Sequence, residues 1–219
     1  MSRSDNEKAK NPSKVFLEWN GTKGGFHYFD KSKGEKGEKV HVPLPLNFMV
    51  LDTLVTIKGF SDSTQSGFWS NEIKSKNISK DILVVRNKTG IVAQGTYSEI
   101  IANRAATGAK FCQSVYIAFK MDGESVIGNI QMKGAALKAW IDFGKVTDIY
   151  KGAITVAKMN DGKKGATKYK IPVFEKVPAD AIAEEKAIEM DKELKAYLDL
   201  YFDNNQAEET TEEVTPNSQ

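Results

Sequence analysis

The residue types that most often carry out catalysis or bind metals are scarce in this sequence. It contains two histidines, His27 and His41, and one cysteine, Cys112. These are too few nitrogen and sulfur ligands for a usual zinc site, and a single cysteine excludes an intramolecular disulfide. Because Cys112 lies in an alternating apolar segment, we expect it to pack in a core rather than act as a nucleophile.

Two common phosphate-binding motifs, Gly-x-x-x-x-Gly-Lys-[Ser/Thr] and Gly-x-Gly-x-x-Gly, are also absent. An enzyme would then need a site built from carboxylates, which spacing alone does not identify when strands bring distant residues together. The sequence predicts no catalytic residue, no metal site and no cofactor. We therefore expect a protein without enzymatic activity.

Aromatic residues beside lysines and glycines are the more informative pattern. They occur in two groups, one near residue 25 and one near residue 65. The predicted nucleic-acid-binding residues are Trp19, Lys23, Phe26, Tyr28, Lys58, Phe60, Phe68, Trp69, Lys74 and Arg86. Stacking of a base on such a ring contributes about 1 to 3 kcal/mol, and neighbouring lysines attract the phosphates. The pattern favours binding of single strands with little sequence preference, because arginine, which reads base edges, is rare here.

A third group of cations lies in a predicted turn. Gly162–Gly165 resembles the Gly-x-x-Gly loop of KH domains, but both flanks are predicted strands, so the segment is better interpreted as a hairpin loop. That loop would present Lys163, Lys164 and Lys168 to a phosphate backbone.

Charge is distributed unevenly along the 219 residues. Residues 178–219 contain 3 basic and 12 acidic residues, whereas residues 1–177 contain 28 basic and 17 acidic ones. The net charges are therefore −9 and +11, although the whole chain is only +2. A basic body attracts polyanions and an acidic terminus competes with them. A lysine-rich solvated surface beside an unrelated acidic terminus remains the alternative.

Periodicity and turn signals divide the chain into four parts. Residues 1–13 are polar and are expected to be a disordered lead, and residues 14–177 contain many short predicted strands with few helices. The predicted fold is mainly β, an OB-like barrel with insertions. An apolar stripe predicts a helix within 178–203, which could mediate homo-oligomers, and residues 204–219 are expected to be a disordered acidic tail.

Two resemblances extend this interpretation. The hairpin around Gly24 is similar to the Lys-Gly-Phe-Gly-Phe strand of cold-shock domains. The basic β body, helix and acidic tail resemble the single-stranded DNA-binding proteins of tailed phages, and the segments 44–62 and 66–74 are similar to a protein shared among crAss-like phages. The resemblance implies an OB fold whose acidic tail competes for the DNA groove and recruits replication proteins.

The leading hypothesis is a single-stranded DNA-binding protein that acts in phage replication or recombination. Its tail acids would occupy the groove until a strand displaces them; they are Glu208, Glu209, Glu212 and Glu213. The alternative is a phage virion or scaffold protein without nucleic-acid activity. With no signal peptide and no long apolar run, we expect no membrane association and a location in the cytoplasm of the infected cell.

Overall fold

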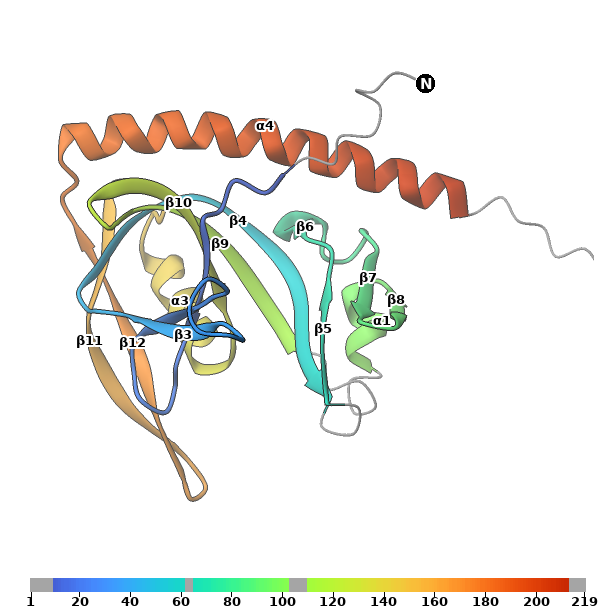
Figure 1. The fold of residues 1–219 in the computed structure, drawn as a ribbon, viewed down its shortest axis with the longest axis horizontal. Coiled ribbons are helices and arrows are strands. Elements are labelled where there is room, and N and C mark those ends of the chain that lie inside the picture. The colour runs from blue at the N-terminus through green and yellow to red at the C-terminus, as the bar shows by residue number, and fades with distance from the viewer. Residues whose placement is uncertain (1–9, 62–64, 103–109, 213–219) are drawn as a thin grey trace, which may run out of the picture.

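The structure is a computed structural model that describes residues 10–61, 65–102 and 110–212. Its fold is mainly β, with a long C-terminal helix (Figure 1). The strands are β1 (Val15–Trp19), β2 (Phe26–Asp30), β3 (Glu38–Val42), β4 (Leu46–Ser61), β5 (Ser66–Ser70), β6 (Ile73–Lys74), β7 (Leu83–Asn87), β8 (Gly90–Gly95), β9 (Lys110–Met121), β10 (Glu124–Met132), β11 (Ala153–Lys164) and β12 (Thr167–Val177). The helices are η2 (Ser75–Asn77), α1 (Tyr97–Ala102), α3 (Gly134–Val146) and α4 (Ala181–Glu212).

The described strands form one sheet of 12 strands. Its main path runs β3-β2-β1-β10-β9-β4-β5-β7-β8, and β11, β12 and β6 lie off this path. Strands β4, β9 and β10 form an antiparallel meander, whereas β1 runs parallel to β10. Strand β1, near the N-terminus, therefore pairs with β10, which lies more than 100 residues later in the sequence.

Strand β4 is shared by two parts of the sheet. One edge pairs with β9 along most of its 16 residues. The other edge pairs first with β11 and then, farther along, with β6 and β5. A register shift between Val50 and Asp52 marks a bulge, which increases bending and twist where the two parts diverge.

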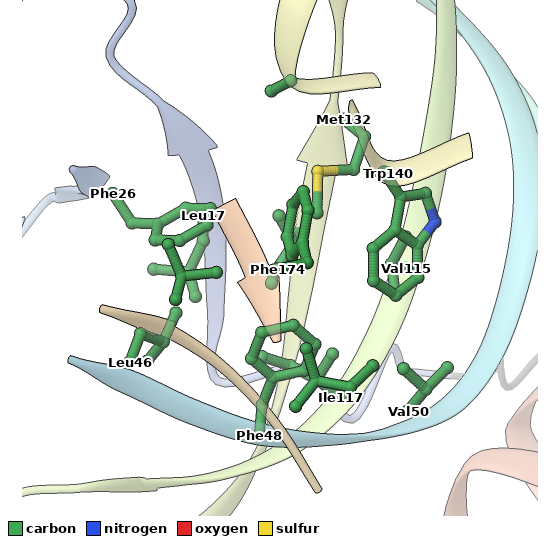
Figure 2. Close-up of a cluster of buried hydrophobic side chains, with 14 of the residues drawn as sticks. Leu17, Phe26, Leu46, Phe48, Val50, Val115, Ile117, Met132, Trp140 and Phe174 are labelled. Carbon is green, nitrogen blue, oxygen red and sulfur yellow. The ribbon is translucent and has the colours of Figure 1, made fainter. Parts of the chain in front are cut away.

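The larger hydrophobic core lies on the inner face of the curved sheet (Figure 2). Helix α3 contributes Trp140, which is 2% exposed and meets the rings of Phe48 and Phe174. A second core lies on the same face between β4, β5, β7 and α1, with Ile57 and Leu83 among its buried residues. One inner face thus holds both cores.

Helix α4 covers part of the opposite, outer face. Its 32 residues span about 48 Å at 1.5 Å per residue. Leu194 and Leu198 pack against Leu54, Tyr116 and Ile127 of the sheet. The stripe that predicted the helix is therefore its packing face, and it lies against this chain's own sheet.

The described sheet is not closed by strand pairing, so a barrel is not confirmed. Two hydrogen bonds nevertheless join β12 to the β1–β2 hairpin. The backbone N–H of Lys170 donates to the carbonyl of Gly21 at 2.6 Å, and the indole N–H of Trp19 donates to the carbonyl of Lys170 at 2.8 Å.

Two predicted boundaries differ from the structure. The helix expected to end at 203 continues to Glu212, so residues 204–212 are helical rather than part of a disordered tail. Residues 10–13 are also placed, because the amide of Asn11 donates to the hydroxyls of Tyr116 and Tyr197 at 3.3 and 3.4 Å. Residues 1–9 of the expected lead and 213–219 of the expected tail lie outside the described residues.

Among the described helices, none is both long and apolar enough to cross a membrane.

Replacing Trp140 with alanine should destabilise the fold by about 3 to 5 kcal/mol, because the cavity left behind cannot collapse between β4 and β12. Urea unfolding followed by circular dichroism measures this loss. The control is Val146→Ala on the same helix, where the side chain is 85% exposed and the expected change is within about 0.5 kcal/mol. A Trp140→Ala loss as small as that of the control would contradict the assigned core.

Candidate nucleic-acid interface

Cross-strand pairing brings cations and rings together on the outer face of the sheet. Lys58 of β4 is paired with Trp69 of β5 on one side and with Lys110 of β9 on the other. Trp69 is in turn paired with Arg86 of β7. Because directly opposite residues project from the same face, these four side chains belong to one surface. Phe60 joins them, since it lies two residues beyond Lys58 on the same strand.

The rings of this group are accessible. Phe60 is 53% exposed and Trp69 is 46% exposed, even though both belong to strands in which other rings are buried. Alternation explains the difference, because their neighbours Ile57 and Phe68 project to the inner face and fill the second core.

The same face continues across β1, β2 and β3. Glu18 is paired with Gln131 of β10 and with His27 of β2, which places Phe16 and Phe29 on the outer face by alternation. Phe16 is 45% exposed and Phe29 is 53% exposed. Lys39 of β3 is paired with Phe29.

We call this surface the ring-and-lysine face. It consists of Phe16, Phe29, Lys39, Lys58, Phe60, Trp69, Arg86 and Lys110.

A groove of about 680 Å³ lies on the β1–β2 part of this face. Phe16 and Phe29 line it, and it reaches β4 at Lys58. Lys14, Lys31 and Lys39 add positive charge to its walls, and Glu18, Asp30 and Asp122 add negative charge. A concave surface with four lysines and exposed rings has properties that suit a flexible polyanion with flat bases.

Two charged groups in the groove have displaced pKa values. Burial lowers the pKa of the Lys58 ammonium, so a phosphate placed there would stabilise the charged form. Burial acts to raise the pKa of Glu18, but the hydrogen bond and charge of Lys133, at 2.9 Å, outweigh it and lower the pKa overall. Glu18 therefore favours its ionised form and forms its ion pair with Lys133.

Helix α4 forms the boundary of the ring-and-lysine face. The Tyr116 hydroxyl donates to the Glu72 carboxylate at 2.7 Å, and the Glu72 backbone N–H donates to the Tyr201 hydroxyl at 2.7 Å. These bonds fix the helix beside β9 and β6. The half of the outer face nearest α4 is covered, and the half that carries the exposed rings is open.

The structure places four of the predicted binding residues on the ring-and-lysine face, namely Lys58, Phe60, Trp69 and Arg86. Lys74 is exposed on the same side of the sheet but lies beside α4, with its ammonium 5.1 Å from the centre of the Phe202 ring.

Phe26 and Phe68, which were predicted to bind nucleic acid, are buried in this structure. They are 0% and 6% exposed, because both project to the inner face and pack in the two cores. Trp19 and Tyr28 also pack partly against the larger core, and the Trp19 indole N–H is occupied by Lys170.

Lys23 is exposed at the tip of the β1–β2 hairpin. The side-chain carbonyl of Asn20 accepts hydrogen bonds from the backbone N–H groups of Thr22 and Lys23 and forms the turn.

Sequence reasoning missed Phe16 and Phe29. The signal was present, because alternation in residues 26–30 separates Phe26 and Tyr28 from His27 and Phe29. In residues 15–19, the charged Glu18 marks the face that points away from the core, and Phe16 shares it.

Of the predicted tail acids, Glu208, Glu209 and Glu212 fall within the backbone range of α4, and Glu213 lies outside the described residues. In comparisons with protein-family models, curated proteins and solved structures, none matches this chain.

The free energy of unfolding of Glu72→Gln, relative to that of wild type, should increase as pH rises. Burial raises the pKa of Glu72 above its usual value, so the unfolded chain ionises first and wild-type stability falls from about pH 4.5 up to the folded pKa. Glutamine has no such titration and keeps an acceptor for Tyr116. Urea unfolding of both proteins across a pH series measures the difference.

The control is Glu193→Gln on the exposed side of α4, which removes one surface charge. A Glu72→Gln difference that stays constant or shrinks with rising pH would contradict the buried position of Glu72.

Proposed function

We propose that this protein binds single-stranded DNA on the ring-and-lysine face, without enzymatic activity. The observation that carries the proposal is the position of exposed Trp69 and Phe60 directly beside Lys58, Arg86 and Lys110. Bases stack on the rings, and the cations contact the phosphates between them. Since every base has a flat face, and since three of the four cations on the ring-and-lysine face are lysines, binding depends little on sequence.

A duplex fits this surface less well than a single strand. Its bases are stacked on one another, so they reach the rings only after unstacking, which costs a few kcal/mol per base. The proposal therefore assigns the protein to steps that expose single strands, in replication or recombination. Following the resemblance to phage proteins, we propose that these steps take place in an infected cell.

The connectivity of the sheet supports an OB-like barrel as the underlying architecture. An OB fold is a five-stranded Greek-key barrel in which a three-stranded meander is followed by a closing hairpin. Here the meander is β4–β9–β10, helix α3 follows it, and the hairpin β11–β12 returns so that β11 pairs with β4. Strand β1 lies beside β10, and the β1–β2 hairpin contacts β12. We propose that β1 is an added strand that bridges the two ends.

The likeness to an OB fold also accounts for the proposed position of the binding face. OB folds bind oligonucleotides across their second and third strands, whose counterparts here are β9 and β10. Helix α4 covers the outer face of these strands at Tyr116 and Ile127. Binding is therefore proposed on the uncovered remainder of that face, from β1 and β2 to β4 and β5.

Ring substitutions test the proposal. Trp69→Ala or Phe60→Ala should weaken binding of an oligo-dT strand by about 1 to 3 kcal/mol, which is about five- to 150-fold, because each removes one stacking platform. Fluorescence anisotropy of a labelled strand measures the affinity. Trp69→Phe should bind nearly as well as wild type but lose most of the tryptophan quenching, since Trp140 is buried and Trp19 partly so.

The matched control is Tyr150→Ala, which removes an equally exposed ring, 53%, outside the ring-and-lysine face. Equal losses for Phe60→Ala and Tyr150→Ala would show that the face has no special role. If wild type binds neither strand nor duplex at low salt, the assembly-protein alternative becomes the better account.

The acidic C-terminus is proposed to compete with DNA and to recruit replication proteins. Replacing Glu208, Glu209, Glu212 and Glu213 by glutamine should tighten strand binding severalfold at low ionic strength. The difference should nearly vanish at about 1 M salt, where the Debye length is about 3 Å. Anisotropy across a salt series measures both. Unchanged affinity at low salt would contradict competition by these acids.

A further inference from the structure

The sheet ends in two very different edge strands. Its main path begins at β3 and finishes at β8, and among the described residues β8 pairs only with β7. Strand edges present unpaired N–H and C=O groups that can pair with another chain, so proteins protect them with charges or proline. Strand β3 is protected in this way, since it contains Glu38 and Lys39 and is followed by Pro43 and Pro45.

Strand β8 lacks the charges and prolines of β3, although a bulge at Val92 interrupts its register with β7. Its sequence, Gly-Ile-Val-Ala-Gln-Gly, contains no charged residue and no proline. Ile91 is 49% exposed and Val92 is 42% exposed. Two neighbouring aliphatic side chains on an unpaired edge lose water contact when a second strand is added beside them.

We propose that β8 pairs antiparallel with β8 of a second copy of this chain. The body formed by residues 1–177 has a net charge of +11, so two copies repel each other where their basic surfaces face one another. The uncharged β8 edge is a place where identical surfaces meet without opposing like charges, which destabilise cross-strand pairs. Strand β8 itself carries no cation that would bind a nucleic acid.

The symmetry of this pairing has a direct consequence for the rest of the sheet. An antiparallel pair of identical strands is related by a two-fold axis perpendicular to the sheet, so both copies present the same face on the same side. Ile91 is paired with Arg86, which belongs to the ring-and-lysine face. The dimer would therefore join two such faces into one, a consequence that rests on the proposed function.

Sedimentation equilibrium of the full chain without nucleic acid tests the pairing. Wild type should approach the mass of two 24.2 kDa chains as concentration rises. Val92→Lys places two like charges in the shared edge, and it should raise the dimer dissociation constant by about tenfold or more. The matched control is Ile141→Lys on α3, which alters an apolar side chain of similar exposure, 41%, and should leave the dimer unchanged.

Circular dichroism confirms that each variant is folded, and Ile91→Lys replaces Val92→Lys if the latter is not. A wild-type chain that stays at the mass of one copy, or a dimer that both lysine variants leave intact, would overturn the proposal. Because the mass is measured without DNA, a dimer that binds no strand would contradict the proposed function and support the pairing.

Discussion

Strand β4 imposes the constraint on which the other parts of the structure depend. Its 16 residues are long enough to contribute to both hydrophobic cores, and alternation along it fixes which residues enter them. Val55 and Ile57 project inward, so Leu54 and Lys58 must project outward. The outer residues then divide by position. Those near Leu54 lie under α4, and those from Lys58 to Phe60 lie beyond it, with Phe60 exposed. The packing of the two cores thus also determines which side chains of β4 form the candidate binding surface.

The division of the outer face also explains why a long helix can lie on the proposed binding side of the sheet. Leu194 and Leu198 bury apolar surface against β4, β9 and β10, and the bonds made by Glu72 and Tyr201 hold the neighbouring turn of α4 in place. The helix therefore limits the accessible face rather than blocking it. A DNA strand that crosses the sheet beside α4 would contact rings of several β-strands, with lysines between them.

Much of the fold could be predicted from the sequence, because alternation, turn residues and the helical stripe are local signals. The β1–β2 hairpin and the packing of Cys112 in a strand follow from such signals and are present in the structure. The face that each ring takes was harder to predict. Residues 26–30 offer two faces with rings on both, and only pairing with β1 and β3 decides that Phe26 is inside and Phe29 outside. The length of α4 was underestimated because acidic composition suggested disorder, whereas an established helix gains one hydrogen bond for each added residue.

The most direct test of the central claim is to find where a bound strand touches the protein. Ultraviolet crosslinking of the full chain to an iodouracil-substituted single strand, followed by peptide mass spectrometry, identifies side chains in contact with bases. The account predicts crosslinks at Trp69 and Phe60 and at Phe16 or Phe29, since these rings are exposed on one outer face of the sheet. Crosslinks confined to the β11–β12 hairpin or to α4 would contradict the assignment of binding to this face.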